Sequence, residues 1–452
     1  MTAIAMSKRL LWQSSRFVRL AHSKAKYPET LELQGTKFKT DEWTNIPPFI
    51  LNLANRTAPH HKNHNHPIGI LNDLIQENFK GMGYTFYNDF LPGVTKYENF
   101  DALGFPEDHP GRSKSDTYYL NKDNLLRTHT SAHEPHCFKE TETPGYFISA
   151  DVYRKDEIDR THYPAFFQME GARHWTISEN VEKEIQEAID LIPKSDIIVE
   201  DPFRTKPFNA ENPKQLYMSD RQCELVQVHL KKTIEYLVSI VFDKAKESAR
   251  LAGSTEPYLN EPLKVRWVEA YFPWTSPSWE IEVWWKGEWL ECCGCGVVQR
   301  QVLQNCDMNN EISWAFGIGL DRIAMLLFGI PDIRLFWTQD ERFHNQFSRG
   351  NINTFKAYSK HPGIKRDVAF WLPNESGLHT NDVMEIVRTY GGDLVENVTC
   401  IDEFIHPKTK KKSQCYRINY QSMDRNLTNE EINEINSKVE GDLVKFFGVE
   451  IR

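Results

Sequence analysis

The sequence predicts an α+β protein made of two folded units. In the first unit, from about residue 29 to residue 340, amphipathic helical segments stand between runs of β-forming residues. In the second unit, from residue 358 to residue 452, the elements follow in the order βαββαβ. A chain of 452 residues is long enough for two or three domains, and we expect a linker over residues 341–357.

The composition excludes two broad classes of protein. Hydrophobic residues make up 40% of the chain and aromatic residues 12%, which excludes a mainly disordered protein. No run approaches the roughly 18 apolar residues of a membrane-spanning helix, so we expect no membrane partner. The formal net charge of −9 argues against a broadly basic nucleic-acid coat but permits a local basic surface.

The eight cysteines are too few for a disulfide framework. Three of them cluster in the sequence C-C-G-C, as Cys292, Cys293 and Cys295, and no second pair stands at zinc-ligand spacing. The pattern therefore favours a tight glycine-rich turn of reduced thiols over a metal site.

Residues 1–28 have the composition of a targeting segment. They contain no Asp or Glu, while Lys, Arg and Ser are frequent, and Leu10, Leu11, Phe17 and Val18 fall on one side of a helix. This pattern predicts a mitochondrial transit peptide and hence a protein of the mitochondrial matrix. A disordered basic tail is the alternative.

The first folded unit begins with residues 41–67, which proline residues and a histidine-rich tract mark as a loop. A solvated loop is favoured over a metal site for His60, His61, His64 and His66. Helical periodicity follows in 68–79, 178–192 (with Ser178 as the expected N-cap) and 222–246. β-forming runs dominate 84–170 and 264–304, residues 193–215 are expected to be irregular, and 314–328 is expected to be a glycine-rich turn leading into a helix.

The second folded unit has strands at 364–372, 394–404, 415–420 and 449–452 and helices at 381–390 and 428–447. This order is the signature of a ferredoxin-like domain, a fold that often but not always binds RNA. Residues 355–452 hold 14 Lys or Arg and 15 Asp or Glu, a net charge of −1. RNA binding would therefore depend on a local patch: Lys408, Lys410, Lys411 and Lys412 in a hairpin, with Arg366 nearby. On charge alone, a solvated lysine turn is favoured.

Three segments carry the residues that point to chemistry: Leu125–His133, Asp151–Gly171 and Trp314–Arg322. The middle one alternates as a hairpin that puts Arg154, Gln168 and Glu170 on one face. An arginine there can bind a phosphate bidentately, and a buried Glu beside a Gln suits an ammonium group. In the third segment small residues permit close approach of a ligand, and Arg322 stands at a helix start, which favours anions.

In this order and spacing, the three segments resemble motifs of the class II aminoacyl-tRNA synthetases, and within that class the phenylalanyl-tRNA synthetases. Further marks are NFDAL at 99–103, YFPWTSPSWEIEV at 271–283, GCG at 294–296 and GIPDIRLF at 329–336. SKHPGIKRDVAFWLP at 359–373 resembles the anticodon-binding ferredoxin-like domain of that family. Both domains on one chain, with a transit peptide, look like the mitochondrial single-chain form. The resemblance implies an antiparallel catalytic sheet flanked by helices.

The resemblance also implies a role for each matching residue. Arg154, Arg322 and His162 would act on the phosphates of ATP. The ATP site as a whole would comprise Arg154, His162, Tyr163, Phe166, Glu291 and Arg322, with adenine between Phe166 and Arg322 and with Mg²⁺ near Glu291. The phenylalanine site would comprise His129, Thr130, Ser131, His133, Gln168, Glu170, Phe272, Trp274, Ala315, Phe316 and Gly317. The partners implied are ATP, L-phenylalanine and tRNA(Phe), and we expect a monomer.

Three positions depart from the family pattern: Phe167 stands where His is frequent, Trp274 where Phe is usual, and Asp321 where motif 3 has Glu. None removes an arginine that binds phosphate, so we expect activity to survive. Two other readings remain: a synthetase-like tRNA-binding protein without activation, and a ligase of the same fold that uses no tRNA. The presence of Arg154, Glu170 and Arg322 argues against the first, and the C-terminal domain argues against the second.

Overall fold

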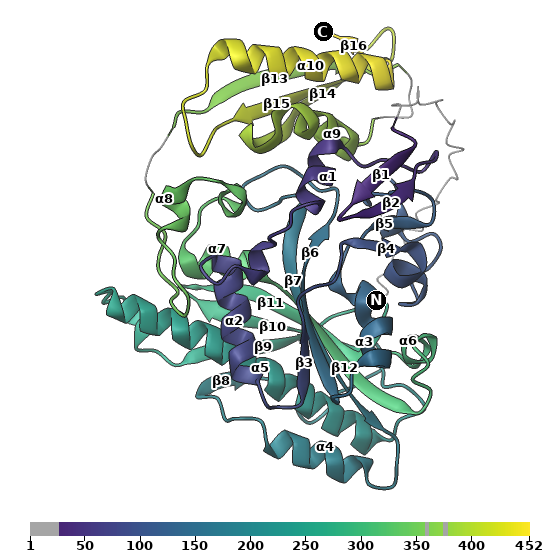
Figure 1. Ribbon diagram of the computed structural model, residues 1–452, viewed down its shortest axis with the longest axis vertical. Coiled ribbons are helices and arrows are strands. Elements are labelled where there is room, and N and C mark those ends of the chain that lie inside the picture. The colour runs from purple at the N-terminus through teal and green to yellow at the C-terminus, as the bar shows by residue number, and fades with distance from the viewer. Residues whose placement is uncertain (1–26, 358–360, 374–377) are drawn as a thin grey trace, which may run out of the picture.

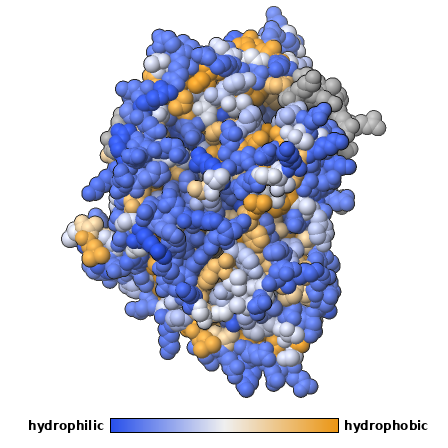
Figure 2. Space-filling view, in the orientation of Figure 1, coloured by the Kyte–Doolittle hydropathy of each residue, from blue (hydrophilic) through white to orange (hydrophobic). Residues whose placement is uncertain are grey.

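The computed structural model describes residues 27–357, 361–373 and 378–452 (Figure 1). The expected transit peptide at 1–28 lies, apart from its last two residues, outside the described residues. Within the described residues no helix is long and apolar enough to cross a membrane. Figure 2 shows a largely hydrophilic face that small apolar patches interrupt.

An eight-stranded sheet forms the centre of the larger unit, in the order β3-β6-β7-β12-β11-β10-β9-β8. The six strands from β6 to β9 in this order are antiparallel, as predicted, whereas β3 and β8 pair in parallel with their neighbours at the two edges. The sheet is therefore mixed. The strands are β3 (Tyr84–Tyr87), β6 (Gly145–Tyr153), β7 (Ala165–Thr176), β8 (Ile197–Glu200), β9 (Leu263–Glu269), β10 (Thr275–Trp285), β11 (Glu288–Val298) and β12 (Glu311–Gly319).

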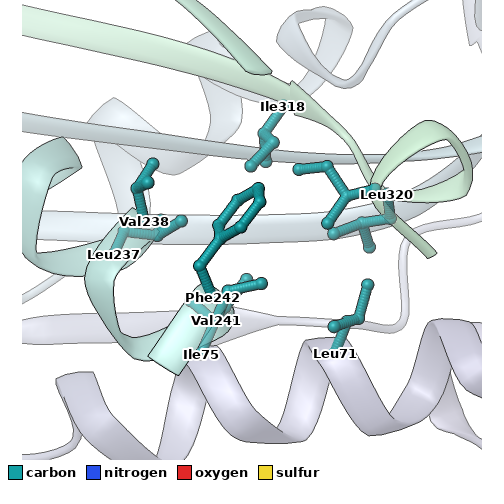
Figure 3. Close-up of a pocket in the computed structure, with 9 residues that line it drawn as sticks. Leu71, Ile75, Leu237, Val238, Val241, Phe242, Ile318 and Leu320 are labelled. Atoms are coloured by element: carbon teal, nitrogen blue, oxygen red, sulfur yellow. The ribbon is translucent and has the colours of Figure 1, made fainter. Parts of the chain in front are cut away.

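One face of this sheet is covered by helices that bury their apolar sides. They are α2 (Pro67–Phe79), α4 (Val181–Asp190), α5 (Asp220–Leu251) and α7 (Leu320–Phe328). The 32-residue α5 starts at a capping box, in which Ser219 and Gln222 satisfy each other's backbone N–H groups. Figure 3 shows side chains of α2 and α5 meeting Ile318 and Leu320. This interface is apolar and too tight for a water molecule, so it is core and not a ligand site.

The opposite face of the sheet is covered only in part. A second apolar cluster there joins short elements to one end of β6, β7 and β12. These elements are β4 (Gly93–Thr95), the π-helix η2 (Tyr97–Asp101), β5 (Asn124–Leu126), the 3₁₀ helix η4 (Thr130–His133), α3 (Glu134–Glu140) and α6 (Arg300–Asn305). The other end of β7 and β12 on this face carries the candidate site described below.

The histidine-rich stretch is not the solvated loop that the sequence predicted. Residues 41–67 contain α1 (Pro48–Ala54), in which Pro48 is the first residue, because proline lacks only an N–H that the first turn would leave unbonded. His60, His61 and His66 are buried, and His60 and His66 stack with ring centroids 4.3 Å apart. In the described ranges no group of three or more His, Cys, Asp or Glu is arranged so that it could hold a metal ion.

Four further predictions about local structure were wrong. Residues 193–215 include the edge strand β8. The N-cap of α4 is Asn180, while the Ser178 hydroxyl accepts a hydrogen bond from the Asn180 N–H at 3.2 Å in the preceding turn. The C-C-G-C cluster lies within β11 and is no turn, although its thiols are free. Finally, residues 315–319 are strand β12 itself, and the helix begins directly after it.

The smaller unit has the predicted ferredoxin-like architecture. Its four-stranded antiparallel sheet has the order β14-β15-β13-β16, with two helices on one face. Its elements are β13 (Ile364–Trp371), α9 (Thr380–Gly391), β14 (Val395–Ile405), β15 (Lys412–Tyr420), α10 (Asn429–Phe447) and β16 (Glu450–Ile451). A hairpin, β1 (Thr30–Leu33) with β2 (Thr36–Lys39), belongs to the larger unit.

The two units touch through the loop that joins β6 to β7. Ile158 of this loop is buried in the apolar cluster of the smaller unit, and its carbonyl accepts a hydrogen bond from Val398 N at 3.0 Å. The Tyr118 hydroxyl donates to Glu385 at 2.9 Å. The smaller unit therefore rests on the loop of the hairpin that the sequence identified as functional.

Residues 341–357, where we expect the linker, pack against the larger unit. They include the short helix α8 (Glu341–His344), and Phe343, Phe347 and Ile352 belong to the main apolar core. Ile352 N donates to the Ser248 hydroxyl of α5 at 3.1 Å. Residues 341–357 thus do not stand apart from the larger unit, and the division at residues 340 and 358 stays a prediction.

Candidate active site

The candidate site lies where β7 and β12 run side by side. Glu170 pairs with Gly317, and Gln168 pairs with Gly319, so these four residues share one face of the sheet. A Cβ atom placed on Gly317 or Gly319 would meet no atom within 4 Å. The two glycines thus leave a hollow beside the two polar side chains, with room for a ligand directly against the strand.

Arg154 lies at one end of this hollow, just after β6. Its Nε donates to the Thr128 carbonyl at 2.7 Å, and its guanidinium lies 5.2 Å from the ring centroid of Phe166. No carboxylate forms an ion pair with Arg154 within the described part of the chain, and burial lowers the pKa of the guanidinium. A half-buried cation that lacks a counter-ion is suited to bind an anionic ligand.

Arg322 is the third residue of α7, and its side chain is exposed. In front of it, buried Asp321 accepts a hydrogen bond from Phe167 N at 2.5 Å, and burial raises the pKa of its carboxyl group to about 7. Asp321 thus fastens the start of α7 to β7 between Phe166 and Gln168. Asp321 stands where motif 3 of the family has Glu, so this difference concerns the attachment of α7 to β7. The structure puts Arg154, and not Arg322, against the ring of Phe166.

A carboxylate-centred pocket adjoins the hollow. Oε2 of Glu170 accepts hydrogen bonds from the Thr130 hydroxyl at 3.0 Å and from the Ser131 hydroxyl, while Oε1 has no partner in the described residues. Thr130 N lies 3.4 Å from Oε1 of Gln168, to which it donates. Burial raises the pKa of Glu170 to about 7. The structure thereby brings together Thr130, Ser131, Gln168 and Glu170, as predicted from the sequence.

Aromatic rings form one wall beside this pocket. The ring of Trp274 stacks between those of Phe105 and Phe272, with centroid distances of 5.1 and 5.9 Å. The imidazole of His129 lies parallel to Phe105 at 5.6 Å, and burial lowers its pKa to about 3, so His129 is neutral. Phe272 packs over Gly294, where a Cβ would come within 2.6 Å of its ring.

Four predicted site residues lie outside the hollow and the Glu170 pocket. Phe316 points to the core face of the sheet and packs against Phe147 and Trp314, because alternation along β12 turns it away from Ala315 and Gly317. His133 stacks on Phe90 at 4.2 Å and accepts a hydrogen bond from Arg127 at 3.0 Å.

The other two belong to the loop between β6 and β7. Tyr163 is in the core, stacks on Trp337, and donates its hydroxyl to Asp393 of the smaller unit at 2.5 Å. His162 is exposed and bonds to Asp159 at 2.7 Å. Burial alone would lower the pKa of His162, but the bond to Asp159 outweighs it and raises this pKa.

Carboxylates on β10 and β11 supply oxygen ligands of the kind that Mg²⁺ prefers. Glu291 is exposed on β11, and Glu280 lies on β10 opposite Gly294. Burial, then the charges of Glu291 and Glu282, raise the pKa of Glu280. Glu282 is ion-paired with Arg266. Because Mg²⁺ commonly takes one or two carboxylates together with substrate phosphates, Glu280 and Glu291 fit such an ion.

Comparison with known proteins agrees with this geometry. The family model "tRNA synthetases class II core domain (F)" matches residues 51–183 and 227–347, and "Ferredoxin-fold anticodon binding domain" matches residues 359–452. The mitochondrial phenylalanine–tRNA ligase of Saccharomyces cerevisiae is 52% identical over 95% of this chain and 97% of its own. Those of Dictyostelium discoideum and Mus musculus are 40% and 38% identical, over 87% and 93% of this chain and 86% and 89% of their own.

The chain belongs to the mitochondrial phenylalanine–tRNA ligases. Sequence reasoning identified the motifs of this family, but it assigned no role to several residues that build the site. These are Phe105, Arg127 and Glu134. Arg127 stands inside the quoted LLRTHTS segment and donates to the carbonyls of Phe90, Leu91 and Asp151, which holds the start of η4. The sequence did offer a signal for Arg127: an arginine among apolar residues is rarely buried unless it has partners, so it indicates a structural role.

Proposed function

We propose that this chain activates L-phenylalanine with ATP and transfers the phenylalanyl group to the terminal ribose of tRNA(Phe) in the mitochondrial matrix. One observation carries this proposal: Arg154, without a carboxylate partner, and the Glu170 pocket flank the hollow over Gly317 and Gly319. A phosphate and an ammonium group would be bound at opposite ends of one hollow, as the reaction requires.

For the nucleotide, we assign Arg154 to the α-phosphate and Arg322, at the start of α7, to the outer phosphates and the adenine. Phe166 would supply the other face of the adenine stack. His162 would reach the outer phosphates from the loop between β6 and β7, where its proximity to Asp159 favours the charged imidazolium. Glu291 and Glu280 would hold Mg²⁺, which neutralises phosphate charge when bound.

For the amino acid, we assign the α-ammonium group to Glu170 and Gln168, with the hydroxyls of Thr130 and Ser131 holding Glu170 in place. The ring would lie against Phe272 and Trp274 and over the glycine and alanine positions of β12.

The chemistry then follows from charge and position. The carboxylate of phenylalanine attacks the α-phosphorus in line and pyrophosphate leaves, so the protein forms no covalent bond. Orientation by Glu170 and charge stabilisation by Arg154 would lower the barrier. In the second step a terminal ribose hydroxyl of the tRNA attacks the acyl group and AMP leaves.

For the tRNA, we propose a surface around the turn between β14 and β15. Lys408 and Lys410 of this turn have no ion pair within the described residues, whereas Lys411 pairs with Glu450 at 3.2 Å and Lys412 with Glu403 at 2.8 Å. The half-exposed ring of Phe404 adjoins the turn and would offer a base a stacking surface.

Arg366, which the sequence placed in the same patch, bonds instead to Asn429 and Asn433 of α10. We also propose that the protein acts as a monomer, since the catalytic and the tRNA-binding unit are joined in one chain.

A matched pair of arginine variants tests the proposed function. Removing one preorganised charge from a transition state commonly costs a factor of about 10² to 10³ in rate. Arg154→Ala should therefore lower phenylalanine-dependent exchange of pyrophosphate into ATP by at least about 10². Arg160→Ala, which removes an exposed arginine of the same hairpin paired with Glu396, should leave it nearly unchanged. Equal exchange in both variants would contradict the assignment.

A further inference from the structure

The segment NFDAL at residues 99–103 has so far been given no role. Its first three residues belong to the π-helix η2, in which Ala102 N donates to the Tyr97 carbonyl at 2.9 Å. π-Helical turns are rare and occur frequently at functional sites. The side chain of Asn99 in this turn is buried, with 0% of the residue's surface exposed. A buried amide needs hydrogen-bond partners, so the partners of Asn99 indicate what the turn does.

Both partners of the Asn99 side chain are groups of Thr128. Oδ1 of Asn99 accepts a hydrogen bond from Thr128 N at 3.0 Å, and Nδ2 of Asn99 donates to the Thr128 hydroxyl at 2.8 Å. Thr128 lies between β5 and η4, where the chain belongs to no helix or strand. Asn99 thus holds one loop residue at two points, which fixes the orientation of that residue as well as its position.

The remaining polar group of Thr128 is its carbonyl, which accepts the hydrogen bond from Nε of Arg154 at 2.7 Å. In the described part of the chain, this is the one hydrogen bond that the Arg154 guanidinium makes. The ring of Phe166 limits the guanidinium from one side but does not fix its direction in the plane of the ring. The direction in which Arg154 presents its other N–H groups to a phosphate therefore depends on where the Thr128 carbonyl lies.

The turn that carries Asn99 is itself firmly attached. The buried guanidinium of Arg112 donates to the carboxylate of Asp101 and to the carbonyl of Phe105, each at 2.6 Å, and lies 5.0 Å from the ring centroid of Phe100. These contacts tie the end of η2 to the loop that follows it. Asn99 is therefore presented to Thr128 from a stiff support.

We propose that Asn99 is a positioning residue for Arg154: through its two hydrogen bonds to Thr128 it fixes the carbonyl that orients the guanidinium toward the α-phosphate of ATP. The inference rests on the proposed role of Arg154. Asn99 itself touches neither ATP nor phenylalanine, and its effect on the rate passes through Arg154.

The test is a double-mutant cycle on phenylalanine-dependent pyrophosphate exchange, with kcat and KM measured separately for ATP and for phenylalanine. The cycle compares the wild type, Asn99→Leu, Arg154→Ala and the double variant. Asn99→Leu keeps the approximate size of the side chain and removes both hydrogen bonds. Asn72→Leu is the matched control, because Asn72 is also buried and also joins segments, through bonds with the His61 carbonyl at 3.0 Å and the Ser149 hydroxyl at 2.6 Å.

A misplacement of about 1 Å at a reacting group can lower a rate by a factor of about 10². Asn99→Leu should therefore lower kcat/KM for ATP by about 10- to 100-fold, with KM for phenylalanine nearly unchanged. In the Arg154→Ala background the same substitution should change the rate by less than about twofold, because the group on which it acts is gone. Asn72→Leu should lower the melting temperature but leave the exchange rate of the folded protein nearly unchanged in both backgrounds.

Thr128 provides a second pair of variants should Asn99→Leu fail to fold. Thr128→Val has nearly the same shape but lacks the hydroxyl, so one of the two points of attachment is lost, whereas Thr128→Ser keeps both. The proposal requires that Thr128→Val lower exchange by roughly 2- to 10-fold and that Thr128→Ser restore it. This difference should vanish in the Arg154→Ala background.

Three outcomes would overturn the inference. Unchanged exchange in Asn99→Leu would show that Arg154 does not need the attachment of Thr128. An equal loss of exchange with and without Arg154 would show that Asn99 acts by another route. A rise confined to KM for phenylalanine would place the effect of Asn99 on η4.

Arg154→Ala by itself separates this inference from the proposed function. If Arg154→Ala leaves exchange unchanged, the assignment of the phosphate site fails. If Arg154→Ala lowers exchange while Asn99→Leu does not, only the inference about Asn99 fails.

Discussion

Arg154 illustrates how its surroundings can leave a residue available to a ligand. Its Nε is held by a single backbone carbonyl, that of Thr128, and its guanidinium lies over Phe166. Arg127, directly after β5, has the same side chain but is ion-paired with Asp151 and buried among carbonyls. The difference in partners makes Arg154 available to an anion and makes Arg127 structural.

At the residue scale, the sequence identified the polar residues that meet at the site but did not determine which way each side chain points. The structure brings Thr130, Ser131, Gln168 and Glu170 together, because they belong to short motifs with a fixed spacing. Phe316 was misplaced because the neighbours of a motif residue on a strand face the opposite side.

Ala315 offers a residue-scale prediction about specificity. It lies two positions from Gly317 on the same face of β12 and pairs with Gly296 and Ala172, which have little or no side chain. An apolar pocket rejects an added hydroxyl by a factor on the order of 100 only, so some activation of tyrosine is expected. Ala315→Ser should reduce activation of para-substituted phenylalanines relative to phenylalanine in exchange assays. An unchanged ratio would show that Ala315 does not line the para position.

At the element scale, β12 explains why part of the site could not be predicted. Its alternating glycines were interpreted as a turn, since glycine is rare in ordinary strand interiors. The glycines are there because the strand forms one wall of a hollow, which only the pairing with β7 reveals. β8 was missed for another reason, because a four-residue, half-exposed edge strand has too few residues to show a pattern.

Two glycines on opposite faces of this sheet give a prediction about the element. Gly317→Val would extend into the open hollow, so it should leave the melting temperature nearly unchanged but lower kcat/KM for phenylalanine by about 10². Gly171→Val would bring Cβ to 2.3 Å from the ring of Phe147 and should destabilise the fold by about 1–3 kcal/mol or more. Thermal unfolding and pyrophosphate-exchange assays on both variants check this. A lower melting temperature for Gly317→Val would show that the space beside Gly317 is not open.

The buried histidines at the start of α2 give a prediction about pH. Burial lowers the pKa of His66 to about 3, and its ring caps the helix by accepting from Ile68 N at 3.2 Å. Between the unfolded pKa of about 6.5 and the folded one, only the unfolded state binds this proton. The stability that neutral His66 contributes is therefore present above about pH 6.5 and is lost as the pH falls toward 3.

His66→Asn keeps a capping acceptor but removes the titration. The free energy of unfolding should then fall less steeply between pH 6 and 4, by about 1.4 kcal/mol per pH unit, as denaturant titrations would measure. Equal slopes for His66→Asn and the wild type would rule out a neutral buried His66.

At the scale of the whole molecule, the two units meet at the hairpin of β6 and β7, to which we assign the phosphates of the nucleotide. The strands and helices of the smaller unit were predicted almost completely, because the spacing of apolar residues within each short segment is enough to identify them. The contact through Ile158 could not be predicted, since a single exposed-looking residue in a charged loop gives no sign that it is buried by another unit.

The charge of the whole molecule leads to a prediction about tRNA. With a net charge of −9, binding should depend on few phosphate contacts and should weaken as salt rises. Replacing both Lys408 and Lys410 by Ala should reduce the slope of log K against log salt by roughly 1–2, because each phosphate contact contributes about one. Lys438→Ala, at a lysine paired with Glu434 on α10, should leave the slope unchanged. If the double variant has the same slope of log K against log salt as the wild type, the tRNA does not contact the turn between β14 and β15.

The central claim is that the face shared by β7 and β12 activates phenylalanine. The most direct test is exchange of labelled pyrophosphate into ATP by the wild-type protein without tRNA, with each of the twenty amino acids supplied alone. Exchange should be strongest with phenylalanine, and weaker with tyrosine by a factor on the order of 100. Stronger exchange with another amino acid, or none from folded protein, would contradict the account.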